Sequence, residues 1–230
     1  MLSLTNLEIE AIELSIKVAF YSVLFTLPLG LLTAWILARK KFYGYSLFNG
    51  IVHLPLVLPP VVVGFFLLTL LGRNGPIGNI LKNTFDITLV FSWQGAAIAS
   101  AVMSFPLMVR AIKISIEGID LKLEDAARTL GASSIKIFYS ITLPLIFPGI
   151  ISGVLLSFAR SLGEFGATIT FVSNIPGETN TLPLSIYSFI QTPEGEANAL
   201  RLVILSIIIA MAALITSEYL TSKAKKSLEG

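Results

Sequence analysis

Long uncharged stretches alternate with short charged segments along this chain. Charged residues bound five such stretches, at residues 17–39, 41–73, 86–110, 136–160 and 201–218. A charge at the bilayer centre costs about 2.5 to 3.5 kcal/mol on insertion scales, and a crossing helix needs roughly 20 residues. Each stretch therefore predicts a membrane-spanning helix, the last one reaching full length by continuing to about residue 221.

Two features modify this simple pattern. The fourth span is expected to continue past Arg160, because no turn signal follows until Asn174, Pro176 and Gly177. A further apolar segment, 182–190, is too short to cross a bilayer and predicts an interfacial or re-entrant helix. The fold class expected is an all-α polytopic membrane protein, with five transmembrane helices and one short interfacial helix in a single domain, 1–230.

The composition agrees with a membrane protein. Hydrophobic residues make up 54% of the chain and charged residues 13%, with a mean hydropathy of +0.84. A soluble domain averages roughly 25% charged residues, so this chain has too few ionic groups for a water-facing surface. The net charge of +2 gives no reason to expect a nucleic-acid partner. With no cysteine and one histidine, disulfides, thiolate metal sites and multi-histidine clusters are excluded.

Basic residues predict the orientation in the membrane. Most of the 16 Lys and Arg residues lie in segments 39–46 and 110–136 and in the tail after residue 222. Loops rich in Lys and Arg stay in the cytoplasm. The N-terminus is therefore expected outside and the C-terminus inside, and one long cytoplasmic connection covers about residues 118–143.

This connection predicts two helices rather than a disordered linker. Apolar residues at helical spacing follow Asp120, which is placed as an N-cap, and Gly131 is placed to end the first helix. A second short helix begins at Ser133 or Ser134 and reaches Leu143, where Pro144 introduces the fourth span. Spacing alone leaves two interpretations open, a solvated amphipathic connector and a docking surface for a partner.

The connection also resembles a known motif. Its pattern of Asp125-Ala126-Ala127, Gly131 and Ile141-Thr142-Leu143-Pro144 resembles the EAA loop of binding-protein-dependent ABC importer permeases. Asp125 replaces the first glutamate of the family pattern, although Glu124 stands directly before it. The segments 53–64, 103–111, 126–132 and 159–168 resemble the molybdate permeases of that family, and sulfate permeases match them less closely. The resemblance implies an ATPase-coupling loop that contains Glu124, Asp125, Ala126, Ala127, Gly131, Ala132, Ile141, Leu143 and Pro144.

The resemblance implies a fold, a function and a set of partners. The fold would be that of type I (MetI-like) ABC importer permeases in a bacterial inner membrane. The function would be import of a tetrahedral oxyanion, most closely molybdate or tungstate, by alternating access. The partners would be a second copy of the chain, two ATP-binding cassette subunits in the cytoplasm and a periplasmic or extracellular oxyanion-binding protein.

Catalysis is not expected in this chain. The glycine-rich segment 72–78 lacks the lysine and hydroxyl of a phosphate-binding loop, so ATP and Mg²⁺ would be bound by the partner ATPase and the chain would need no cofactor. The alternatives are a sulfate or thiosulfate ABC permease, a secondary anion transporter and an anion channel. Secondary transporters usually contain internal repeats, and none is visible here.

Candidate pathway or gate residues lie at the end of the fourth span. Arg160 and Glu164, four residues apart, are expected on one helical face, where they can pair. An intramembrane charge is a functional candidate by default, although a pair that only fixes one helix against its neighbours is the stronger expectation. Small and hydroxyl residues lie close to this pair in the sequence, namely Ser161, Gly163, Gly166 and Thr168. They fit both close helix packing and pore lining, and packing is favoured by about two to one.

Overall fold

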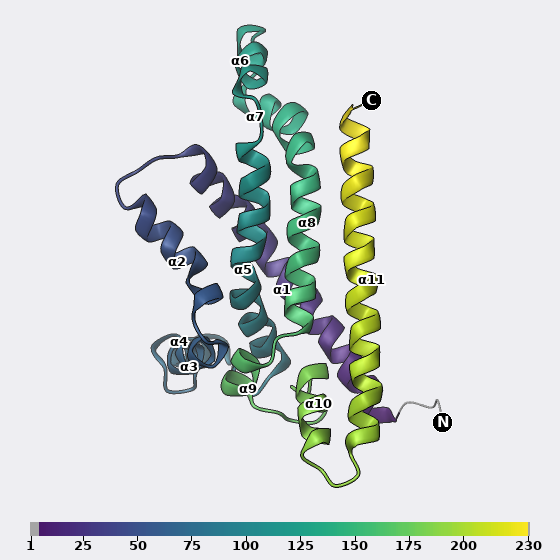
Figure 1. The fold of residues 1–230 in the computed structure, drawn as a ribbon. Helices are drawn as coiled ribbons and strands as arrows, with labels where there is room; N and C mark the ends of the chain where they lie inside the picture. Colours follow the sequence, from purple (N-terminus) through teal and green to yellow (C-terminus); the bar gives the residue numbers. More distant parts are fainter. Residues whose placement is uncertain (1–4, 230) are drawn as a thin grey trace.

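The computed structural model describes the backbone of residues 5–229 and the side chains of residues 5–223, and this part of the chain is helical with short connections (Figure 1). The helices are α1 (Asn6–Arg39), α2 (Tyr45–Val57), α3 (Pro60–Leu71), α4 (Pro76–Phe85), α5 (Trp93–Glu117), α6 (Leu121–Thr129), α7 (Ser134–Ile137), the π-helix η1 (Phe138–Thr142), α8 (Leu143–Leu162), α9 (Gly166–Val172), α10 (Leu182–Ile190) and α11 (Glu196–Glu229). In the described residues, four helices are long and apolar enough to cross a membrane, or five if α2 and α3 form one broken span.

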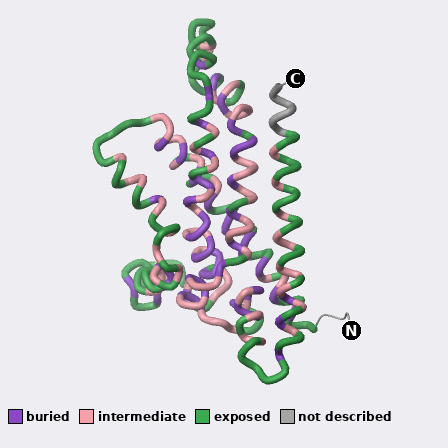
Figure 2. Tube along the Cα trace, viewed as in Figure 1, coloured by how far each residue is buried: buried purple, intermediate pink, exposed green. Residues whose placement is uncertain are grey.

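The centre of the bundle is formed by α1, α5 and α8, which pack along much of their lengths. Buried residues concentrate there, whereas α2 and α11 are largely exposed (Figure 2). Close approach depends on small residues, since a Cβ at Gly30 of α1 would lie 3.1 Å from Cγ of Met108 in α5. Buried hydroxyls link the same three helices. Ser22 Oγ lies 2.8 Å from Ser161 Oγ and 3.4 Å from Ser104 Oγ.

The second predicted span is not one straight helix. Helix α2 ends at Val57, α3 begins at Pro60, and their axes differ by 113°. Consecutive prolines explain the break, because Pro60 disfavours a helical conformation at Pro59, whose ψ is 133°. The prediction of five spans therefore holds only if this bent pair counts as one.

The fourth predicted span is wrong at both ends. It does not continue to residue 173, because α8 ends at Leu162 and α9 is a separate short helix. Nor does Pro144 separate it from the second loop helix, since residues 134–162 run as one helix through η1. Pro144 has no N–H to donate to the i to i−4 hydrogen bonds of an α-helix, and its ring clashes with the carbonyl four residues earlier. The wider π-helical turn η1 therefore precedes it.

The remaining short helices lie away from the loop. The predicted short helix at 182–190 is confirmed as α10, while its interfacial or re-entrant position stays a prediction. Its first backbone N–H, at Leu182, donates to Ser15 Oγ of α1 at 2.6 Å. Helix α4 was not predicted from the sequence. The start of α1 lies at the same end of the bundle as α9 and α10, and the end of α11 lies at the same end as α6 (Figure 1).

Candidate functional sites at the α6 loop and the α8–α9 break

The α6 loop has the helix caps that its sequence predicts. The Asp120 side chain accepts from the backbone N–H of Lys122 at 3.0 Å, and Ser133 caps α7 in the same way. Gly131 has a φ of +82°, a conformation that glycine adopts without steric cost. The N–H of Ala132 bonds to the carbonyl of Ala127, which completes a Schellman motif at the end of α6. Residues within the loop itself therefore determine the conformation of this turn.

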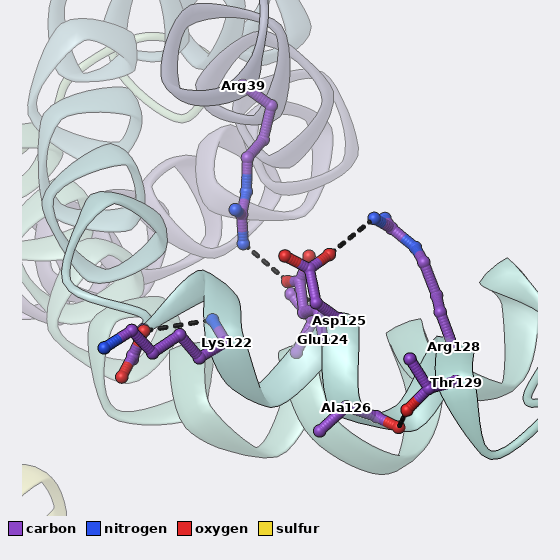
Figure 3. A network of polar contacts seen from close by, with 9 residues as sticks. Arg39, Lys122, Glu124, Asp125, Ala126, Arg128 and Thr129 are labelled. Atoms are coloured by element: carbon purple, nitrogen blue, oxygen red, sulfur yellow. Dashed lines mark hydrogen bonds and ion pairs between the residues drawn. The ribbon is translucent and has the colours of Figure 1, made fainter.

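The two adjacent carboxylates of α6 lie in different environments (Figure 3). Glu124 is 7% exposed, and its Oε1 lies 2.6 Å from Nη2 of Arg39, the last residue of α1. The same oxygen accepts from Thr142 Oγ1 at 3.0 Å. Asp125 is exposed and pairs only with Arg128 on its own helix, at 3.0 Å. Glu124 is therefore bound within the chain, whereas Asp125 is available to a partner.

The small residues of the predicted coupling loop gather at one groove. It has a volume of about 290 Å³ and lies between α6 and the helix that follows the turn. The groove is lined by Ala127, Leu130, Gly131, Ala132, Lys136, Ile137, Ser140 and Ile141. Large apolar side chains stand exposed around it, among them Leu130 (88%) and Ile135 (72%). Leu143 and Pro144 are half-buried at the start of α8, outside the groove, and Ala126 is exposed on α6.

At the α8–α9 break, Arg160 and Glu164 do pair, with Nη1 and Oε2 2.7 Å apart. The predicted reason was wrong, because Glu164 does not lie on the same helix as Arg160. It lies in the break, and its second oxygen accepts from the backbone N–H of Ala167 in the first turn of α9 at 2.8 Å. The Glu164 side chain is 1% exposed and that of Arg160 is 28% exposed. The buried carboxylate thus fixes the end of α8 to the start of α9.

Most of the small residues near this pair make contacts within the chain. Ser161 bonds to Ser22, and Thr168 Oγ1 donates to the carbonyl of Glu164. A Cβ at Gly166 would lie 2.7 Å from Cβ of Pro60, so this glycine permits α9 to approach α3. Gly163 differs, since it is exposed and a Cβ there would meet nothing within 4 Å. Packing within one chain therefore explains three of these four residues and leaves Gly163 unexplained.

One buried ion pair was missed from the sequence. Glu8 of α1 is fully buried, and its Oε1 lies 3.1 Å from Nη2 of Arg201 in α11. Glu8 also completes a capping box with Thr5, a pattern readable from the spacing Thr-x-x-Glu before an apolar run. The partner on α11 could not be read from spacing. Among the described residues, no group of three or more His, Asp or Glu side chains could hold a metal ion.

Comparison with known proteins identifies the family of this fold. Residues 26–226 match the model of the binding-protein-dependent transport system inner membrane component. The molybdenum transport system permease protein ModB of Escherichia coli K12 is 60% identical over 217 residues, covering 94% of this chain and 95% of that protein. The ModB protein of Haemophilus influenzae is 57% identical, with 96% and 97% covered. The sulfate transport system permease protein CysT of Salmonella typhimurium is 38% identical, covering 90% of this chain and 73% of that protein.

Solved structures share the fold at low sequence identity. A chain of a bacterial ABC transporter involved in the import of alginate superposes with a TM-score of 0.76 at 20% identity, covering 96% of this chain and 80% of its own length. A chain of the MetNI methionine ABC transporter gives 0.69 at 14% identity, with 94% of each chain covered. The predicted type I importer fold is confirmed. The chain therefore belongs to the binding-protein-dependent transport system inner membrane components, the multi-pass permease subunits of ABC importers.

Proposed function

We propose that this chain moves a tetrahedral oxyanion, molybdate or tungstate, into the cytoplasm by alternating access. The observation that carries the proposal is the identity of 57 to 60% with two molybdenum permeases over nearly the whole chain, compared with 37 to 40% for sulfate permeases. This difference in identity favours molybdate over sulfate. The chain itself has no catalytic activity and binds no cofactor.

The working transporter contains two copies of the chain, two ATP-binding cassette subunits and an oxyanion-binding protein. The match to permeases of ABC importers supports an ATPase partner, and because the sequence has no phosphate-binding loop, ATP would be hydrolysed by that separate subunit. The groove beside Gly131, with Leu130 and Ile135 exposed around it, is suited to a partner because large apolar side chains seldom gather around a groove without one. We assign the ATPase to this groove, the α6 end to the cytoplasm and the start of α1 to the outside.

The translocation pathway passes the α8–α9 break, at the interface of the two copies. The Arg160 side chain is 28% exposed and Glu164 neutralises its charge, so a dianion that reached the guanidinium would meet donors without being trapped by a strong cationic site. Gly163 lies in open space beside them, and no contact within the chain requires a glycine there. These two residues are the best candidates for contact with the ion.

Uptake into proteoliposomes tests this function. The chain, its ATPase subunit and its binding protein are reconstituted, and uptake of molybdate, tungstate and sulfate is measured with and without internal ATP. We expect ATP-dependent uptake of molybdate and tungstate and little uptake of sulfate. Preferential sulfate uptake would identify a sulfate permease instead. Uptake that needs neither ATP nor the binding protein would indicate a channel, and uptake that follows an ion gradient would indicate a secondary transporter.

A further inference from the structure

The buried carboxylate of α6 has two partners on two other segments. Oε1 of Glu124 accepts from Nη2 of Arg39 at 2.6 Å (Figure 3). The same oxygen accepts from Oγ1 of Thr142 at 3.0 Å. Arg39 ends α1, and Thr142 ends the π-helix that leads into α8. One oxygen atom thus connects α6 to two of the three helices at the centre of the bundle.

Within the part of the chain that the structure describes, helix α6 has no other ion pair to the bundle. Glu124 is the one residue of α6 that is buried, while its large apolar side chains, Leu121 and Leu123, are 56% and 49% exposed. The helix projects beyond the ends of α5 and α8 (Figure 1). An apolar anchor permits sliding, whereas a charge-assisted hydrogen bond fixes direction and distance. The position of α6 relative to the bundle therefore depends on Glu124.

The segment that holds Thr142 is irregular. The π-helix at Phe138–Thr142 carries i to i−5 bonding, with the N–H of Leu143 bonded to the carbonyl of Phe138. Single π turns inside helices frequently occur at functional sites. The link from Glu124 to α8 therefore passes through an irregular turn rather than through regular α-helix.

We propose that Glu124, held by Arg39 and Thr142, is the joint that transmits movement of α6 to α1 and α8. The inference rests on the proposed function, in which α6 is driven by an ATPase. In this arrangement Asp125 faces the ATPase, and Glu124 faces the bundle. Glu124 and Arg39 are positioning residues, because they act on the pathway through the helices that they connect.

The first test measures the position of α6 without requiring transport. Thr129 and Lys40 are both exposed, and the chain has no cysteine, so Thr129→Cys and Lys40→Cys introduce two labelling sites per chain. Because the proposed transporter holds two copies of the chain, it is assembled from one copy with both spin labels and one unlabelled copy without cysteine. We expect a narrow distance distribution with native Glu124 and a distribution at least twice as broad with Glu124→Gln. Glu117→Gln, which removes a carboxylate of α5 that pairs with Lys113 and not with Arg39, should leave the distribution narrow. Equal widths in all three proteins would overturn the proposal.

The second test measures coupling in proteoliposomes of the complete transporter. With Glu124→Gln or Arg39→Gln, we expect assembled complexes that hydrolyse ATP at a near-normal rate, while oxyanion uptake per ATP falls about tenfold. The exchanged pair, Arg39→Glu with Glu124→Arg, should recover at least part of that ratio. Glu117→Gln, which removes the ion pair between the exposed Glu117 and the half-buried Lys113 in α5, serves as the matched control and should leave the ratio unchanged.

The outcomes of these two tests distinguish a failure of the Glu124 proposal from a failure of the proposed function. An unchanged ratio of uptake to hydrolysis in assembled Glu124→Gln complexes would overturn the joint. Loss of assembly in Glu124→Gln, Arg39→Gln and the exchanged pair alike would also overturn it, in favour of a purely structural pair. Failure of the native transporter to take up oxyanion would contradict the proposed function alone, and the spin-label distances would still decide whether Glu124 fixes α6.

Discussion

Glu8, two residues after the start of α1, pairs with Arg201 near the start of α11, with Oε1 and Nη2 3.1 Å apart. The Glu8 side chain is fully buried, while that of Arg201 is 35% exposed. This pair joins the first and last long helices of the chain at the end opposite α6 (Figure 1).

The unequal burial of this pair predicts unequal effects of mutation. Arg201→Ala leaves a buried carboxylate without its counter-charge, a change that costs about 3 to 5 kcal/mol for buried pairs in general. Glu8→Gln keeps a group of the same shape for the Thr5 cap and leaves an arginine that water can reach, so it should cost less. Thermal unfolding of the purified chain in detergent should show a larger loss of midpoint temperature for Arg201→Ala. Equal losses, or a larger loss for Glu8→Gln, would contradict this explanation.

The Gly131 turn gives a second prediction. Because φ is +82° and a Cβ there would meet nothing within 4 Å, the backbone conformation alone restricts this position. Asparagine tolerates the left-handed region, a β-branched residue does not, and proline is locked near −65°. Gly131→Asn should therefore retain most uptake, while Gly131→Val and Gly131→Pro should separate ATP hydrolysis from uptake in protein that still reaches the membrane.

Vesicle uptake and ATPase assays on the three Gly131 variants, at matched amounts of membrane-inserted protein, check this order. Unchanged uptake with Gly131→Pro would show that the turn does not need its glycine conformation. Loss of uptake with Gly131→Asn as well would indicate that the side chain, rather than the backbone, disturbs the groove.

The features that were predicted correctly from sequence depend on local chemistry. The caps at Asp120 and Ser133, the turn at Gly131 and the bounds of α10 follow from residues within a few positions of each other. The length of hydrophobic stretches likewise located the long helices. The uncharged stretch at 41–73 could not show whether Pro59 bends its span or breaks it, because that also depends on what α3 packs against.

The features that could not be predicted depend on pairings between distant segments. Glu124 was placed in the coupling loop without a partner inside the chain, and the structure shows its side chain buried beside Arg39 and Thr142. Glu8 and Arg201 were not recognised as partners for the same reason. The residue types were informative in each case, and only the three-dimensional arrangement identified which charges meet.

The orientation in the membrane gives a third prediction. Glu178 and Ser134 are exposed at opposite ends of the bundle, one in the connection between α9 and α10 and the other at the start of α7. A membrane-impermeant thiol reagent added to intact cells should label Glu178→Cys, and it should label Ser134→Cys only after permeabilisation. The reverse pattern would contradict the positive-inside assignment and the placement of the ATPase at α6.

The last prediction concerns the ion pair at the α8–α9 break. Glu164 is buried and holds both Arg160 and the N–H of Ala167, so Arg160→Ala leaves a buried charge without compensation and Glu164→Ala removes two contacts. If the pair is structural, each single change should reduce the yield of assembled dimer or its uptake. The double change should then be milder than the sum of the two, because the sites interact directly. Glu164→Gln, which can still accept from Ala167, should be milder than Glu164→Ala.

Contact with the transported ion predicts a different result for the same variants. Arg160→Ala would then assemble normally, lose uptake at limiting oxyanion and recover it at high oxyanion, because a lost binding contact is overcome by concentration while a misplaced helix is not. Measuring dimer yield together with uptake over a range of oxyanion concentrations separates the two. Additive losses with intact assembly would end the ion-pair explanation, whereas a saturable defect confined to Arg160→Ala would place its guanidinium in the pathway beside Gly163.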